Sequence, residues 1–153
     1  MSGFTPVHLD RSAICRLIPH RPPMLLLDEA VWHEPERLVA RRTFSAEEFF
    51  LQGHFPGDPV VPGVILCECA LQAGAVLAAL RHPGLLCDSR PVVTRLQQVR
   101  FKRMVRPNEC VEAEVQLTDK AADAYYMHGR LRVLQTVAAT LEFACMMTQR
   151  STS

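Results

Sequence analysis

The sequence predicts an α+β fold in which one antiparallel β-sheet wraps around a single long, apolar α-helix. The first observation is the segment 64–80, whose only strongly polar side chains are Glu68 and Gln72. A helix that is apolar nearly all round belongs in a core. The second observation is that β-rich runs with partial alternation flank this helix, two before it and four after it. A sheet rolled around the helix would explain why the helix has no polar face.

Prolines divide the part of the chain that precedes the long helix. Pro19 ends a short amphipathic segment, and a proline-dense loop leads to the long helix at 62–80. Pro62 suits the first helical turn because its missing N–H costs nothing there. The expected elements before that helix are a short helix, the two strands of a hairpin and one helical turn: 10–18, 24–33, 37–45 and 46–50.

Four β-rich runs follow the helix, whose end is marked by Pro83 and Gly84. Turn residues at 107–108, 118–123 and 135–136 separate these runs. A long strand at the edge of the sheet would offer unpaired backbone groups to a second copy, which makes a homodimer natural. The expected strands are 92–105, 110–117, 124–134 and 137–148.

Length and charge narrow the class of protein. With 153 residues, the chain is long enough for one domain and too short for two ordinary ones, so we predict a single domain over 1–153. The net charge is +1 with both signs interspersed, which does not favour a nucleic-acid partner. Residues 1–10 lack a secretory pattern, so a cytoplasmic location is expected. The segment 64–80 is short for a membrane span and carries Glu68, so a core helix is expected instead.

The chain has six cysteines, which we expect to be reduced thiols because no export signal accompanies them. Cys67 and Cys69 lie on either side of Glu68, which points them to different faces of the helix. No second pair has the spacing of a zinc site, so no metal centre is predicted.

Glu68 and His54 are the candidates for acid–base chemistry. Burial disfavours an ionised carboxylate and raises its pKa, and a protonated carboxylic acid is what a general acid requires. His54 lies in the proline-pinned loop before the helix, and a histidine titrates in the range of a general base. The N-terminus of the helix would supply oriented N–H donors for a developing enolate. Taken alone, His54 could equally be a hydrogen-bonded loop histidine.

Three motifs combine into a resemblance to a known family. They are LIPHRPPMLLLDEAV at 17–31, FFLQGHFPGDPVVPGVILCECALQ at 49–72 and VRFKRMVRPNECVEAEV at 99–115. Together they resemble the FabZ-type 3-hydroxyacyl-acyl carrier protein dehydratases, over about residues 17–147. The resemblance implies a hot-dog fold, the name given to a sheet wrapped around a central helix.

The resemblance also implies roles for individual residues. His54 matches the histidine that handles the α-proton of the acyl thioester, and Glu68 matches the acid that protonates the departing β-hydroxyl. Gly63 and Val64 match the helix start whose backbone N–H groups receive the thioester carbonyl. Gln72 matches an amide one helical turn beyond the acid, where it would satisfy a neighbouring buried polar group. In this family the histidine of one subunit works with the glutamate of its partner, so a homodimer, often assembled as a trimer of dimers, is implied.

The implied reaction removes water from a (3R)-3-hydroxyacyl thioester on acyl carrier protein and leaves the trans-2-enoyl thioester. No metal or organic cofactor is required. Lys102, Arg103 and Arg106 are either solvated edge charges or a docking patch for the acidic carrier protein. His20 and Arg21, in the opening motif, are expected to tie their loop to the core.

Departures from the family pattern leave the pathway open. Cys67 and Cys69 beside the acid, and Leu71 where a small residue is common, are expected to reshape the acyl tunnel. The protein could therefore act either in fatty-acid synthesis or in a specialised lipid or polyene pathway. A glutamate rather than an aspartate as the acid favours the FabZ type over the isomerising FabA type. The alternatives are a hot-dog thioesterase, which would not need His54, and a non-catalytic paralogue that binds acyl carrier protein.

Overall fold

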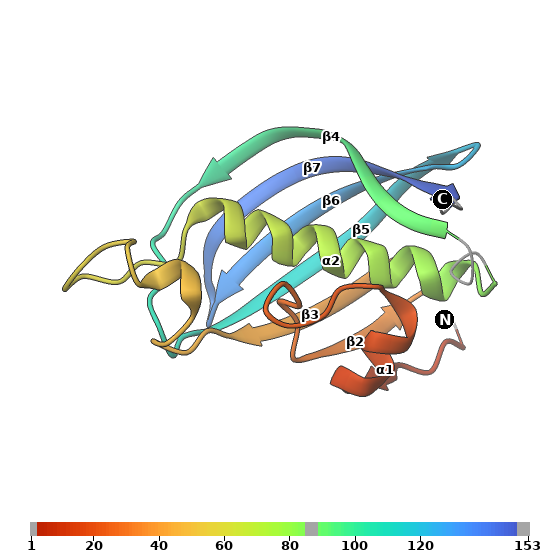
Figure 1. The fold of residues 1–153 in the computed structure, drawn as a ribbon. Helices are drawn as coiled ribbons and strands as arrows, with labels where there is room; N and C mark the ends of the chain where they lie inside the picture. Colours follow the sequence, from red (N-terminus) through yellow and green to blue (C-terminus); the bar gives the residue numbers. More distant parts are fainter. Residues whose placement is uncertain (1–2, 85–88, 150–153) are drawn as a thin grey trace.

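A computed structural model describes residues 3–84 and 89–149 and confirms the predicted α+β class. A seven-stranded antiparallel sheet curves around α2 in the order β1-β2-β3-β5-β6-β7-β4 (Figure 1). The short helix α1 lies beside β2 (Figure 1). The strands are β1 Val7–Leu9, β2 Glu29–Glu34, β3 Arg37–Thr43, β4 Ser89–Phe101, β5 Cys110–Ala121, β6 Ala124–Val133 and β7 Thr136–Gln149; the helices are α1 Arg11–Leu17, the 3₁₀ turn η1 Phe49–Leu51 and α2 Gly63–Arg81.

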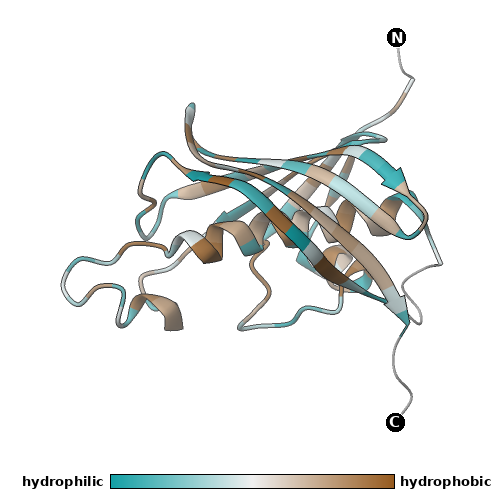
Figure 2. Cartoon of the chain, turned by 90° about the horizontal axis from the view of Figure 1, so that it is seen from above, coloured by the Kyte–Doolittle hydropathy of each residue, from teal (hydrophilic) through white to brown (hydrophobic). Residues whose placement is uncertain are grey.

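The core lies between α2 and the concave face of the sheet. Figure 2 shows hydrophobic residues along α2 where it lies against the strands. By length and composition α2 could span a membrane, but here most of its side chains are buried inside the protein. Close packing demands a glycine in the middle of this helix, since a Cβ on Gly74 would lie 2.7 Å from the ring of Phe143 and 2.8 Å from the sulfur of Met127.

The central strands alternate as a half-buried sheet should. Along β6, every second residue is buried against α2, from Tyr125 to Val133, because successive side chains point to opposite faces. The outer face carries cross-strand ion pairs instead, such as Arg37 with Glu114 at 2.7 Å. Six of the seven strands and both α-helices thus form close to where the sequence predicts them.

Three predicted details were wrong. The strand β1, which pairs with β2 through Val7 and Trp32, was not predicted. The predicted strand 24–33 begins only at Glu29, because backbone groups of the preceding segment bond to the side chain of Gln72 on α2 instead of to a neighbouring strand. The helical turn predicted at 46–50 is the 3₁₀ turn η1, and α2 begins at Gly63, with Pro62 as its N-cap.

The strand β4 forms one edge of the sheet and is bonded to β7 alone. Its neighbouring residues Val92 and Val93 are 44% and 41% exposed. Successive residues of a strand point to opposite faces, so neither face of β4 is covered in this part of the strand. Leu96 and Phe101 are exposed as well. A long edge strand of the kind that we expected to pair with a second copy is therefore present, and several of its exposed side chains are apolar.

Candidate active site

The loop before α2 holds His54 by its backbone and by its ring. The His54 carbonyl accepts the N–H of Val60 at 2.9 Å, and its N–H donates to Leu51 at 3.2 Å. Its imidazole stacks on Phe55 with ring centroids 4.2 Å apart. Gly57, at φ +75°, supplies the left-handed turn that a bulkier residue rarely adopts. This loop fixes the direction in which the imidazole points.

One hydrogen bond determines the tautomer of His54. Its Nδ1 lies 2.7 Å from the carbonyl oxygen of Val60. A carbonyl can only accept, so Nδ1 must carry the proton. In the neutral imidazole, Nε2 then holds the free lone pair, and no residue in the described parts of the chain bonds to it. His54 is therefore arranged as a base whose accepting atom is Nε2.

The first turn of α2 presents unused backbone donors beside His54. The first N–H groups that bond within this turn belong to Ile65 and Leu66, both to Pro62, and no side chain caps the helix. The N–H groups of Gly63 and Val64 therefore remain available, as expected at a helix N-terminus. Gly63 cannot carry a side chain without moving its neighbour, because a Cβ there would lie 2.7 Å from the ring of Phe101.

A cavity of about 500 Å³ joins these groups. Its walls include His54, both helix-start residues and the segment that follows β4. The structure thus brings the predicted base, the predicted carbonyl-binding donors and two of the three predicted docking residues around one space. The residues named in the prediction that line it are His54, Gly63, Val64, Lys102 and Arg103.

The other predicted catalytic residue, Glu68, is less buried than expected. Its side chain keeps 27% of its surface exposed, whereas Gln72, one turn later, is 1% exposed. Full burial of Glu68 in the core was therefore a wrong expectation, since the curved sheet leaves this part of α2 uncovered. Glu68 does not line the cavity that holds His54. The chain contains the two halves of the predicted acid–base pair in separate places.

Gln72 sets the orientation of the carboxyl group of Glu68. The Oε1 atom of Gln72 accepts the backbone N–H of Leu26 at 2.8 Å, which fixes the amide orientation because an N–H can only donate. Its Nε2 atom then donates to the carbonyl of Met24 at 2.7 Å and to Oε1 of Glu68 at 2.9 Å. Since Oε1 of Glu68 accepts this bond, the acidic proton of a neutral Glu68 resides on Oε2.

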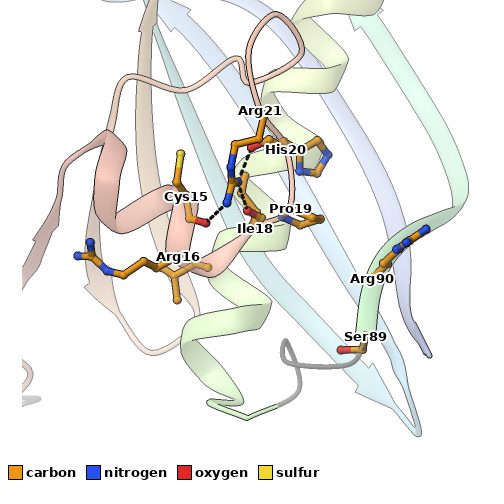
Figure 3. Close-up of a pocket in the computed structure, with 9 residues that line it drawn as sticks. Cys15, Arg16, Ile18, Pro19, His20, Arg21, Ser89 and Arg90 are labelled. Atoms are coloured by element: carbon orange, nitrogen blue, oxygen red, sulfur yellow. Dashed lines mark hydrogen bonds between the residues drawn. The ribbon is translucent and has the colours of Figure 1, made fainter. Parts of the chain in front are cut away.

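The opening motif of residues 17–31 builds the wall beside this carboxyl group. Arg21 donates to the carbonyls of Cys15, Ile18 and His20 (Figure 3), so it ties the loop to α1 and to itself, whereas we expected it to tie the loop to the core. His20 does more than close the loop, because its Nε2 atom lies 3.7 Å from Oε1 of Glu68. The motif signalled a special position for His20, but only the fold shows that it faces the acid.

Asp28, at the end of the same motif, anchors the buried guanidinium of Arg42. Its Oδ1 accepts from Arg11 and Arg42, both at 2.9 Å, and its Oδ2 accepts the N–H of Thr43 at 2.9 Å. Glu48 completes the pairing of Arg42 at 2.6 Å. This part of the motif holds the first hairpin to the loop that follows it and lies apart from the two candidate catalytic groups.

Two of the three predicted docking cations are already paired. Arg103 donates twice to Glu109, at 3.1 and 2.6 Å, and these contacts lower the pKa of Glu109. Arg106 pairs with Asp58, in the turn that follows His54. Lys102 forms no ion pair within the described residues. Over those same residues, no three histidine, cysteine or carboxylate side chains gather as metal ligands do.

Comparisons with known proteins identify a family and several relatives. The profile of the family described as FabA-like domain matches residues 18–141. A relative from Anaeromyxobacter sp. (strain K), named 3-hydroxyacyl-acyl-carrier-protein dehydratase FabZ, is 40% identical over 144 residues, which are 93% of this chain and 92% of the relative. A relative with the same name from Caulobacter sp. (strain K31) is 34% identical over 93% of this chain and 88% of the relative. Another, from Chloroflexus aggregans, is 45% identical over 68% of this chain and 72% of the relative.

A solved structure shows the same fold. The dehydratase heterocomplex ApeI:P from Xenorhabdus doucetiae superposes with a TM-score of 0.74, at 18% identity, over 91% of each chain. This likeness confirms the predicted hot-dog arrangement of sheet and helix.

Proposed function

Because the chain belongs to the FabA-like family and its relatives are FabZ dehydratases, we propose that it removes water from a (3R)-3-hydroxyacyl thioester carried on acyl carrier protein. The product is the trans-2-enoyl thioester. The observation that carries the proposal is the hydrogen bond from Nδ1 of His54 to the Val60 carbonyl at 2.7 Å. It leaves Nε2 of His54 free to act as the base, and among the described residues His54 is the only histidine that lines its cavity.

Each bond change has a group assigned to it. Nε2 of His54 takes the proton from the α-carbon, and the thioester carbonyl receives the developing charge, which the N–H groups of Gly63 and Val64 stabilise. Oε2 of Glu68 gives its proton to the β-hydroxyl, the C–O bond breaks, and water leaves as the double bond forms. The cycle closes when the proton held by His54 returns to Glu68 through solvent. An acid–base pair of this kind contributes about 10²–10⁴-fold in rate.

A homodimer that shares its sites would unite His54 with Glu68. The two ends of β4 lie at the two half-sites: Ser89 and Arg90 line a cavity with His20, beside Glu68, and Phe101 lines the cavity with His54. If two copies pair antiparallel along this edge, the start of one β4 meets the end of the other. That pairing brings His54 of each subunit towards Glu68 of the other. The exposed apolar residues of β4 support this arrangement.

The surface beside His54 suits an acidic carrier protein. Lys102 is the cation at this cavity without an ion-pair partner among the described residues, whereas the charge of Arg103 is met by Glu109. We therefore place the centre of the docking patch at Lys102, where an opposite charge on the carrier would speed and orient the encounter. Arg106 would contribute less because Asp58 already pairs with it.

The test is the reversible hydration of a trans-2-enoyl thioester on acyl carrier protein, followed by the loss of enoyl absorbance. We expect wild-type turnover, and we expect His54→Ala and Glu68→Gln each to lose about 10²-fold or more while staying folded. Near wild-type turnover in either variant would refute the assigned roles. A wild type that releases free acid without hydration, over short and long acyl chains, would favour the thioesterase alternative.

A further inference from the structure

A histidine that is not part of the acid–base pair stands beside the acid. Nε2 of His20 lies 3.7 Å from Oε1 of Glu68, too far for a hydrogen bond but close enough for a charge to act. This is the same oxygen that accepts the Gln72 amide at 2.9 Å. One oxygen of the carboxyl group thus faces two nitrogens, and no residue in the described ranges bonds to Oε2.

The position of His20 is held by its loop. Arg21 binds the carbonyls of Cys15, Ile18 and His20 itself, at 2.7 to 2.9 Å. Figure 3 shows these bonds, with the His20 imidazole pointing towards α2 and Arg90 on the far side of the cavity. The side chain of His20 keeps only 25% of its surface exposed. The loop backbone is therefore held in place, and the largely buried imidazole lies beside Glu68.

The surroundings of His20 disfavour its protonated form. Burial lowers its pKa, and this effect exceeds the opposing attraction of Glu68. Its Nδ1 atom is buried and finds no partner among the described residues. The charged groups around it are Glu68 on α2 and Arg21 on its own loop, with Arg16 on α1 and Arg90 on β4 lining the same cavity. The positive charges of these arginines also disfavour protonation of His20.

The charge of this neighbour matters for an acid. A cation beside a carboxyl group favours the ionised form, which cannot donate a proton, whereas a neutral imidazole leaves the protonated form accessible. We propose that His20 is a positioning residue of the dehydratase, whose imidazole closes the Oε1 side of Glu68, so that the proton passes to the substrate from Oε2. The inference rests on the proposed function, and it adds His20 to Gln72 as a residue that positions the carboxyl group of Glu68.

Three substitutions test the inference in the hydration assay, with kcat and KM measured across the pH range. His20→Gln keeps a neutral N–H donor and is expected to stay within about threefold of the wild-type kcat. His20→Leu removes the polar wall and is expected to lower kcat about tenfold with little change in KM, a fraction of the acid's contribution. His20→Lys introduces a cation, which favours ionised Glu68, so the alkaline limb of the pH profile should move to lower pH by about one unit.

His82 provides a matched control. It is also a partly buried histidine whose pKa is lowered by burial and whose Nε2 is buried without a partner in the described chain. It caps the far end of α2, about 20 Å along the helix from Glu68 at about 1.5 Å per residue. His82→Leu and His82→Lys are expected to leave both kcat and the pH profile unchanged.

The outcomes separate this inference from the proposed function. Full kcat in His20→Leu, or the same pH profile in His20→Lys as in His82→Lys, would overturn the role of His20 while leaving an active dehydratase. A wild type without hydration activity would overturn both. Thermal unfolding of each variant shows whether a loss of kcat reflects the site or the fold, and His20→Gln provides a folded reference.

Discussion

At the scale of single residues, the directions of a few hydrogen bonds determine which atoms of His54 and Glu68 remain free. His54 and Glu68 are both groups that could donate or accept, and in each case a neighbour that can do only one thing removes the ambiguity. The Val60 carbonyl leaves the lone pair of the neutral His54 imidazole on Nε2, the atom that we propose as the base. The Gln72 amide, itself oriented by Leu26, occupies Oε1 of Glu68 and leaves Oε2 as the proposed donor. Backbone groups thus orient both side chains.

Gln72→Leu tests this dependence. Leucine has a similar size but cannot bond, so the N–H of Leu26 and the carbonyl of Met24 would be left unpaired in the core. Each unsatisfied group costs about 1–3 kcal/mol, so the free energy of unfolding should fall by about 2–6 kcal/mol. The kcat should fall as well, because Glu68 loses its donor. Urea unfolding followed by the hydration assay measures both effects.

Gln135→Leu is the matched control for that substitution. Gln135 is exposed in the turn between β6 and β7, away from the proposed β4 interface. The free energy of unfolding should change by less than about 0.5 kcal/mol. Equal unfolding midpoints for Gln72→Leu and Gln135→Leu would contradict the structural role of the buried amide.

At the scale of elements, α2 both fills the core and presents chemistry at its open places. Its first turn offers two N–H donors because no side chain caps it, and the exposed flank that carries Glu68 exists because the sheet does not close over it. The middle of the helix, by contrast, packs so tightly that only glycine fits at position 74, against Phe143 and Met127. The same helix therefore has a tightly packed middle, and it presents N–H donors at its first turn and Glu68 on its exposed flank.

Gly74→Ala tests the rigid centre. The added methyl would meet two buried side chains at 2.7 and 2.8 Å, and overpacking of this kind costs about 1–3 kcal/mol. Alanine recovers up to about 1 kcal/mol through its better helix propensity, so we expect a net loss of about 1–2 kcal/mol in the free energy of unfolding. Gly53→Ala, where nothing lies within 4 Å, should be close to neutral. A Gly74→Ala protein as stable as Gly53→Ala would refute the packing argument.

The same scale shows what the amino-acid pattern could and could not predict. The apolar run of α2 and the alternation of β5 to β7 come from burial, which a sequence displays directly. The segment 24–28 was mistaken for part of a strand, since its buried apolar residues look alike whether their backbone bonds to a strand or to Gln72. The turn at Asn108, which takes φ +67°, was predictable because asparagine tolerates the left-handed region.

The candidate site was predictable in its residues but not in its layout. His54, Glu68 and Gln72 were named from motifs, yet neither the partial exposure of Glu68 nor the approach of His20 to it has a signature in the sequence. Both depend on where a curved sheet ends and how a distant loop folds back. Such contacts join residues far apart in the chain, which a local pattern does not encode.

At the scale of the whole molecule, the edge strand β4 separates the two candidate catalytic groups. In the single chain, His54 lies in a cavity at one end of β4, and Glu68 lies near a cavity at the other. Pairing along the exposed edge would complete two equivalent sites by a single two-fold axis. The central claim is therefore that activity belongs to the dimer and not to the single chain.

Hybrid dimers test that claim most directly. A His54→Ala chain and a Glu68→Gln chain, co-expressed with different affinity tags and purified together, would form a dimer with one intact shared site. We expect about half of the wild-type activity per dimer, since one of two sites works. A wild-type chain paired with a His54→Ala/Glu68→Gln double variant should be inactive, because each shared site then lacks one group. The opposite result, an inactive first hybrid and a half-active second, would show that each subunit holds a complete site and would contradict the account.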